Sequence, residues 1–264
     1  MAYACYPMVS KALTVIRGYF NQGNAALFPA TCGRQCVCNA LSSLMWSQLK
    51  PLELWERQDL DSILMNGNSL YTHLSHALQQ NYILPIELPN MLNLANQTFK
   101  INCGNPYFGQ IDTEVSDLLS GQFALHDAIL GAMSQSHSMF FTLGSYRSAF
   151  TSAIAILYIT TCVGFLIATV VVHRALVWQI GTSVALVFQD IQSLIWYMNN
   201  LTMSLGLDPK RSTFEVVPVN IILVPNLSAH TEIESELQTC CSSVDLGSQH
   251  GRLGQTSCKQ AILC

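Results

Sequence analysis

Residues 33–46 read Gly-Arg-Gln-Cys-Val-Cys-Asn-Ala-Leu-Ser-Ser-Leu-Met-Trp, and no other stretch of the chain is as informative. Its apolar residues recur at helical spacing, which predicts a helix that begins near Cys36 and ends before Pro51. The stripe that this helix buries consists of Val37, Ala40, Leu41, Leu44 and Met45. A cysteine in the first turn of a helix meets unpaired backbone N–H groups and the positive end of the helix dipole, which lower a thiol pKa from about 8.5. Cys36 is therefore a candidate nucleophile.

Gln22 is the candidate partner of this cysteine, and it lies fourteen residues before Cys36. Papain-like enzymes, which carry their cysteine nucleophile at the start of a helix, also place a side-chain amide where the oxyanion of the tetrahedral intermediate forms. Gly23, Pro29 and Gly33 lie in the intervening loop, so the loop can fold the Gln22 amide back over the start of the helix.

The neighbouring cysteines allow two other interpretations. Cys38 is a competing thiol, but two positions further along a helix it faces another side than Cys36. A zinc site made of Cys32, Cys36 and Cys38 would lack a second ligand pair at suitable spacing. By composition alone, a helical cysteine is more often a small core residue. The sequence implies no metal and no organic cofactor.

The rest of the chain contains further predicted helices and strands. Helices are expected at 59–65, 69–78, 123–133 and 190–205, with Gly67 as the stop signal between the first two. Strands are expected at 139–143, 182–188 and 214–224, the last one interrupted by Pro218. Residues 82–88 suit an edge strand or a loop, and residues 90–121 are polar with a weak strand near Phe99. Helices followed by strands that alternate with helices predict an α+β fold.

Composition limits the domain organisation and the function. Half of the 264 residues are apolar and 11% are charged, and a net charge of −4 provides no basic surface for nucleic acid. We expect a lead at 1–18, one domain at 19–225 and a polar, disordered tail at 226–264. The N-terminus lacks the pattern of a secretory signal, so the ten cysteines indicate a reducing, cytoplasmic or nuclear setting rather than a disulfide framework.

Several segments together resemble one protein family. They are Phe20-Asn-Gln-Gly, Gly33-Arg-Gln-Cys-Val-Cys-Asn-Ala-Leu, Trp55 with Asp59-Leu-Asp-Ser-Ile-Leu, Gly67-Asn-Ser-Leu-Tyr, Phe141-Thr-Leu-Gly-Ser-Tyr and Gly181-Thr-Ser-Val. These segments resemble the papain-like deubiquitinases of herpesvirus large tegument proteins, and they are closer still to relatives carried by mobile elements in animal genomes. The resemblance covers about 19–225 except for 147–180, and it is most specific around Cys36.

This resemblance implies a fold, an activity and a partner. The implied fold is papain-like α+β, in which a helical subdomain led by the Cys36 helix packs on a small, mainly antiparallel sheet. The implied activity is hydrolysis of ubiquitin conjugates after the C-terminal glycine, with ubiquitin or a ubiquitin-like protein as the partner. Cys36 matches the nucleophile of the family, and Gln22 matches its oxyanion glutamine.

One part of the family's site is missing from the sequence. The resemblance implies an Asp-x-His motif between Tyr146 and Gly181, which supplies the orienting carboxylate and the general base, but no Asp-x-His occurs anywhere in the chain. The one histidine in that region is His173, which we interpret as a structural or boundary residue, with a catalytic base as the alternative. The other histidines before the tail do not fit the motif and suit helix surfaces or loops: His73, His76, His126 and His137. The sequence therefore predicts an incomplete catalytic triad.

The region of the missing motif supports two further interpretations. Residues 153–172 are uncharged and mostly apolar, with Arg147 and Arg174 near their ends, and they are long enough for one membrane-spanning helix. The alternative function is therefore that of a catalytically dead single-pass membrane protein. On another hypothesis, codons for Phe-Asp-Ser-His-Ser-Arg-Gly-Pro-Ser, read one base later, encode Leu-Ile-Ala-Thr-Val-Val-Val-His-Arg, which is residues 166–174. The motif would then be hidden in the wrong reading frame, and the membrane helix would be an artefact.

Overall fold

The computed structural model describes residues 11–112, 119–145, 148–159, 164–167, 183–204 and 207–225. The chain divides into two compact units, Met1–Val224 and Pro225–Cys264, and the helices and strands below belong to the first unit. The predicted tail at 226–264 lies outside the described residues. Residues 168–174, to which most of the reading-frame hypothesis applies, also lie outside them.

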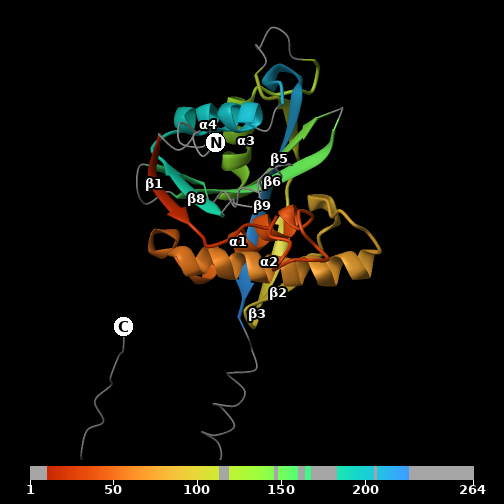
Figure 1. Cartoon of the computed structure of the whole chain (residues 1–264). Coiled ribbons are helices and arrows are strands. Elements are labelled where there is room, and N and C mark those ends of the chain that lie inside the picture. Colours follow the sequence, from red (N-terminus) through yellow and green to blue (C-terminus); the bar gives the residue numbers. More distant parts are fainter. Residues whose placement is uncertain are drawn as a thin grey trace, which may run out of the picture. The chain divides into compact units, whose positions relative to one another are not determined.

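One antiparallel sheet forms the centre of the first unit (Figure 1). Its strands follow the order β1-β8-β7-β6-β5-β9-β3-β2, and β4 also pairs with β9. The strand bounds are Ala12–Arg17 (β1), Met91–Leu94 (β2), Gln97–Cys103 (β3), Tyr107–Gln110 (β4), Ser138–Ser145 (β5), Ser148–Ile159 (β6), Gly164–Ile167 (β7), Val184–Phe188 (β8) and Ser212–Val224 (β9).

Helices cover both faces of this sheet (Figure 1). The described residues include four α-helices, namely Cys36–Leu49 (α1), Arg57–Leu78 (α2), Leu125–Gln135 (α3) and Ile191–Ser204 (α4). Helices α1 and α2 pack on one face, and α3 and α4 pack on the other. The side chains of β9 alternate between the two cores, since Val217 and Val219 join α1 and α2 whereas Phe214 and Val216 join α3 and α4. The α+β fold expected from the sequence is confirmed.

Most of the predicted elements are present within a few residues of their expected bounds. The helices expected at 123–133 and 190–205 are α3 and α4, and the strands expected at 139–143, 182–188 and 214–224 are β5, β8 and β9. The segment 82–88 is a loop that contains a short 3₁₀ helix, Pro85–Glu87, rather than an edge strand. Two more 3₁₀ turns, Leu52–Leu54 and Pro209–Arg211, precede α2 and β9.

β9 is the central strand, although Pro218 lies within it, so the predicted interruption is wrong. One edge of β9 pairs with β5, and the other edge pairs with β4 at residues 213–216 and with β3 at residues 219–224. The Pro218 carbonyl accepts a hydrogen bond from the Gly104 N–H at 2.8 Å, so the Pro218 nitrogen faces the same edge. It falls between the end of β3 and the start of β4, where the ladder needs no N–H donor.

The polar region 90–121 holds more strand than expected. β2 and β3 form a hairpin in which Leu94 pairs with Gln97, and its two-residue loop has positive φ angles of 51° at Ala95 and 62° at Asn96. The strand expected near Phe99 is β3, whereas β2 and β4 were not expected. Residues 12–17, which the sequence analysis assigns to an N-terminal lead, form β1 and pair with β8 at the edge of the sheet.

The membrane helix expected as an alternative at 153–172 is wrong for every one of these residues that the structure describes. Residues 153–159 belong to β6 and residues 164–167 form β7, and both strands have antiparallel partners. Buried strands produce uncharged apolar runs just as helices do, so the apolar character of a run does not separate the two. In the described part of the chain, no helix is both long and apolar enough to cross a bilayer.

Helix α2 is continuous from Arg57 to Leu78, so the prediction of two short helices separated at Gly67 is wrong. Gly67 is buried in the middle of α2 and faces Asn39 of α1. A Cβ atom at position 67 would lie 2.8 Å from the Cα of Asn39, which is too close for two carbon atoms. Gly67 therefore permits a close crossing of two helices. In the sequence alone, a glycine at such a crossing cannot be distinguished from a glycine that ends a helix.

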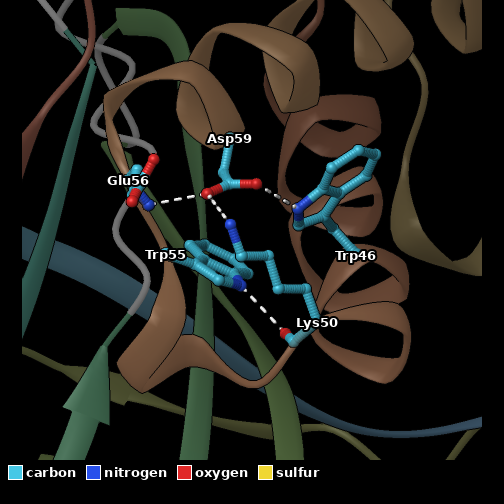
Figure 2. A network of polar contacts seen from close by, with 5 residues as sticks. All are labelled: Trp46, Lys50, Trp55, Glu56 and Asp59. Atoms are coloured by element: carbon cyan, nitrogen blue, oxygen red, sulfur yellow. Dashed lines mark hydrogen bonds and ion pairs between the residues drawn. The ribbon is translucent and has the colours of Figure 1, made fainter.

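A buried aspartate joins the end of α1 to the start of α2 (Figure 2). Lys50 Nζ donates to Asp59 Oδ2 at 2.7 Å, and the Glu56 backbone N–H donates to the same oxygen at 2.6 Å. Trp46 Nε1 donates to Asp59 Oδ1 at 3.3 Å. The Trp55 indole N–H donates to the Lys50 carbonyl at 3.0 Å and closes the turn between the helices.

These contacts favour the ionised form of Asp59 in the folded protein. Burial alone would raise the pKa of Asp59, but the Lys50 ammonium and the N–H groups of Glu56 and Trp46 outweigh burial and lower that pKa below its usual value. The unfolded chain, with an aspartate pKa of about 3.9, then binds the proton more readily than the folded protein. The stabilisation is therefore complete above the unfolded pKa and is lost as the pH falls through the lower, folded pKa.

We expect Gly67→Ala to destabilise the protein, although alanine is the better helix former by about 1 kcal/mol. The added methyl group would push α2 away from Asn39, and such overpacking costs about 1–3 kcal/mol. Urea unfolding measures the change in the free energy of unfolding. Ser69→Ala, at an exposed position of the same helix, is the control and should be neutral or slightly stabilising. Equal stability of the two variants would contradict the close crossing.

We expect Asp59→Asn to lower the free energy of unfolding at pH 7 by about 1.5–3 kcal/mol, because three donors lose a charged acceptor. The difference from the wild type should shrink as the pH falls below about 4, where the aspartate of the unfolded chain takes up a proton, and should vanish once the pH is below the lower pKa of the folded protein. Urea unfolding between pH 3 and pH 7 measures it. Asp127→Asn is the control, because Asp127 also lies in a first helical turn but is exposed. A pH-independent difference would disprove the role of the charge.

Candidate active site

Cys36 is the first residue of α1, as predicted, and the first ten of the fourteen residues of α1 are buried. Every residue from Cys36 to Met45 is buried, so the apolar stripe predicted from the sequence understates the burial of this helix. Cys36 keeps 7% of its surface exposed, whereas Cys38 keeps none. The first turn of α1 therefore lies at the boundary between the core and the solvent.

The side chain of Gln35 connects the residue before Cys36 to α2. Gln35 Nε2 donates to Thr31 Oγ1 at 2.8 Å and to Asn68 Oδ1 at 2.7 Å, and the Thr31 hydroxyl also donates to Asn68 Oδ1. Gln35 is 1% exposed, so water does not compete for these hydrogen bonds. This network holds the approach to α1 in one position.

The loop between Gln22 and Gly33 folds back on itself, so that Gln22 lies next to the start of α1. The Gly33 N–H donates to the Gln22 carbonyl at 3.1 Å, and Gly33 has a φ of 74°, which favours glycine. Phe28 in the middle of the loop is 2% exposed and packs edge-on against Phe20, with ring centroids 5.9 Å apart. The structure thus brings Gln22 and the Cys36 helix together.

The side chain of Gln22 lies against α1. Asn39 Nδ2 donates to Gln22 Oε1 at 3.0 Å, and Asn39 is 0% and Gln22 2% exposed. Asn39 follows Cys36 by about one helical turn, so this bond holds the Gln22 amide beside the first turn of α1. Gln22 Nε2 is buried, and no group in the described part of the chain accepts a hydrogen bond from it. An amide donor of this kind can bind a substrate oxygen.

The other cysteines of this region have different surroundings from Cys36. Burial, and to a smaller extent the neighbouring Cys36, raises the pKa of Cys38 far above the usual thiol value, so Cys38 stays protonated. Cys32 Sγ donates to the Gly23 carbonyl at 3.1 Å. Within the described ranges, no three His, Cys, Asp or Glu side chains are placed so that they could hold a metal ion.

The described histidines occupy the surface positions expected of them. His73 and His76 are exposed on α2, and His137 is exposed in the loop before β5. His126 Nδ1 lies 3.2 Å from Asp127 Oδ1 on α3, across the sheet from α1. His173 lies outside the described residues.

Two asparagines of the site were not identified from the sequence. Asn39 holds the Gln22 amide, and Asn68 accepts from Gln35. Asn39 has a detectable signal, because it is a polar residue inside an apolar helical segment and lies three positions after the candidate nucleophile. Asn68 has no such signal, because the sequence suggests a break between two helices next to it, at Gly67.

Comparison with known proteins identifies the fold and the family of the chain. The crystal structure of the ubiquitin-specific protease encoded by murine cytomegalovirus tegument protein M48, in complex with a ubiquitin-based suicide substrate, has a TM-score of 0.62 to this chain. At 15% sequence identity, the match covers 88% of this chain and 97% of that one, and it shows a shared papain-like fold. A search of curated proteins found no match.

A family profile shows the family of the chain, which the structural likeness alone does not. The family described as the herpesvirus tegument protein, N-terminal conserved region, matches residues 17–158, which is more than half of the chain and includes both the Gln22 loop and the Cys36 helix. The chain therefore belongs to the herpesvirus tegument protein family, through the N-terminal conserved region of that family.

Proposed function

We propose that this domain binds ubiquitin or a ubiquitin-like protein and acts on its C-terminal carbonyl group as a cysteine peptidase of the deubiquitinase type. The observation that carries the proposal is the buried Gln22 amide, which Asn39 holds one turn from Cys36 while Gln22 Nε2 has no acceptor among the described residues. The fold shared with a viral ubiquitin-specific protease supports ubiquitin as the partner. A thiol nucleophile needs a reducing compartment, so we propose the cytoplasm or the nucleus as the location.

In the proposed reaction, Cys36 Sγ attacks the carbonyl carbon at the C-terminus of ubiquitin, and the carbonyl oxygen takes up the electron pair as an oxyanion. Gln22 Nε2 donates to this oxyanion, and a donor of this kind contributes about 3–4 kcal/mol to catalysis. The tetrahedral adduct then collapses to a thioester and expels the amine, which takes a proton from water. Attack of a second water molecule on the thioester releases ubiquitin and restores the thiol.

Turnover by this chain is expected to be slow. The sequence contains no Asp-x-His motif, so the rate factor of roughly 10²–10⁴ that a general base in this motif supplies is expected to be reduced or lost. The proposed enzyme therefore has a nucleophile and an oxyanion donor but lacks the family's motif for the base and its carboxylate.

A ubiquitin with a C-terminal vinyl methyl ester tests the proposal without requiring turnover. We expect the probe to form a covalent adduct with the wild-type protein, detected by mass spectrometry, and we expect Cys36→Ala to abolish the adduct. Cys38→Ala is the matched control and should keep it, because the Cys38 thiol is fully buried and protonated. A folded wild-type protein that forms no adduct would contradict the proposal, as would an adduct that survives in Cys36→Ala.

The reading-frame hypothesis has a separate test. On this hypothesis, the transcript across codons 146–181 encodes Asp-Ser-His, and the corrected chain cleaves ubiquitin conjugates faster by roughly 10²–10⁴. Sequencing the transcript and comparing single-turnover rates of the two chains measures this difference. If the transcript encodes residues 166–174 in the reading frame of the printed sequence, the reading-frame hypothesis is wrong.

A further inference from the structure

The proposed role of Gln22 depends on the orientation of its amide group. A half-turn of the amide exchanges Oε1 and Nε2 with almost no change in shape, but it replaces a hydrogen-bond donor with an acceptor. In the reversed orientation, a carbonyl lone pair would face the developing oxyanion, and the stabilisation would be lost. A neighbouring group must therefore select one of the two orientations.

We propose that Asn39 is a positioning residue that selects the productive orientation of the Gln22 amide, an inference that rests on the proposed function of Gln22. Asn39 Nδ2 donates to Gln22 Oε1 at 3.0 Å, so the carbonyl end of the amide faces α1 and the Nε2 end stays available. Asn39 is 0% and Gln22 2% exposed, so no bulk water replaces this hydrogen bond if the Gln22 amide turns alone. Asn39 Oδ1 lies against Gly67 and has no hydrogen-bond partner among the described residues, so the close approach of Gly67, rather than a second hydrogen bond, fixes which end of the Asn39 amide faces Gln22. A buried polar group that loses its partner costs about 1–3 kcal/mol, which is enough to hold one orientation.

The backbone of Asn39 is itself fixed by the crossing of α1 and α2. Its N–H donates to the Gln35 carbonyl at 2.8 Å in the first turn of α1. On the other side, Gly67 of α2 approaches so closely that a Cβ atom there would collide with the backbone and the side-chain amide of Asn39. The absent side chain of Gly67 leaves the space in which the Asn39 amide lies. Gly67 thus contacts Asn39, and Asn39 in turn is hydrogen-bonded to Gln22, the proposed oxyanion donor.

The chemistry of asparagine suits this role better than that of similar side chains. An ionised aspartate at position 39 only accepts hydrogen bonds, so it would attract Gln22 Nε2 and turn the amide into the unproductive orientation. A leucine of similar size neither donates nor accepts, so it would leave both orientations accessible. Substitutions at position 39 therefore affect the amide in distinct ways.

Two ubiquitin probes separate the orientation of Gln22 from other effects. A C-terminal aldehyde reacts with Cys36 Sγ through addition to its carbonyl carbon, and the carbonyl oxygen becomes an oxyanion before it takes up a proton from water. A C-terminal 2-bromoethylamide reacts by displacement, in which Sγ forms a thioether and bromide leaves, so no oxyanion forms. The ratio of the two rates reports on the oxyanion donor, and it cancels changes in folding, ubiquitin binding and thiol reactivity.

We expect Asn39→Asp and Asn39→Leu to lower this ratio by about tenfold or more, toward the value of Gln22→Glu, since loss of an oxyanion donor costs about 10²–10³ in rate. Asn200→Asp is the matched control, because Asn200 Nδ2 donates to the Trp196 carbonyl at 2.7 Å on α4, on the other face of the sheet. The ratio should be unchanged in that variant. Asn39→Leu adds no charge to the core, so it serves as the test where Asn39→Asp does not fold.

The possible outcomes distinguish this inference from the proposed function. If the wild-type protein forms neither adduct, the proposed function fails and the role of Asn39 fails with it. If the wild type forms both adducts and Gln22→Glu lowers the ratio while the Asn39 variants do not, only the positioning role of Asn39 is overturned. Equal losses with both probes in the Asn39 variants would also overturn it, because they would indicate a purely structural role.

Discussion

The burial of the first ten residues of α1 is the constraint on which the rest of the structure depends. Water does not reach the polar side chains of these ten residues, so their hydrogen bonds must come from the protein. Ser43 Oγ donates to the Ala40 carbonyl of the same helix at 2.7 Å, Asn39 Nδ2 donates to Gln22 in the neighbouring loop, and Ser42 Oγ has no partner among the described residues. The sheet, α2 and this loop form the walls around these residues, and the last two also supply the residues of the candidate site. Core packing and site geometry are therefore two aspects of one arrangement.

Elements that carry their own periodicity and boundary signals could be predicted from the sequence. The sequence predicts that a helix begins near Cys36, and α1 begins at this residue. The elements α3, β5, β8, α4 and β9 follow their apolar patterns closely. Helix α2 was divided in error, because a glycine at a close crossing is indistinguishable from a glycine at a helix end until the neighbouring helix is known. β6 was mistaken for part of a membrane helix, because the sequence shows how apolar a run is but not which strands pair with it.

The residues of the candidate site also fall into two groups, those that could be predicted from the sequence and those that could not. Cys36 and Gln22 could be selected from the sequence, since their surroundings resemble a known family and their chemistry is complementary. The role of Asn39 could not be selected, because its partner lies 17 positions earlier in a loop whose path only the fold reveals. The Gln35 network is similar, since its acceptor Asn68 lies 33 positions away on another helix. Local patterns identify reactive groups, whereas the groups that orient them depend on tertiary contacts.

The central position of β9 affects how the protein can be made. Within the described chain β9 is the last strand to be synthesised, yet it is the common neighbour of β3, β4 and β5. At a translation rate of about 5–20 residues per second, the ribosome needs on the order of ten seconds to proceed from β3 to β9. During this interval the nascent chain exposes unpaired strand edges and the apolar surfaces that β9 later covers. Chaperone protection would matter most in this interval. A ribosome that stalls before residue 212 would hold two groups of paired strands and the unpaired β4 without the strand that joins them.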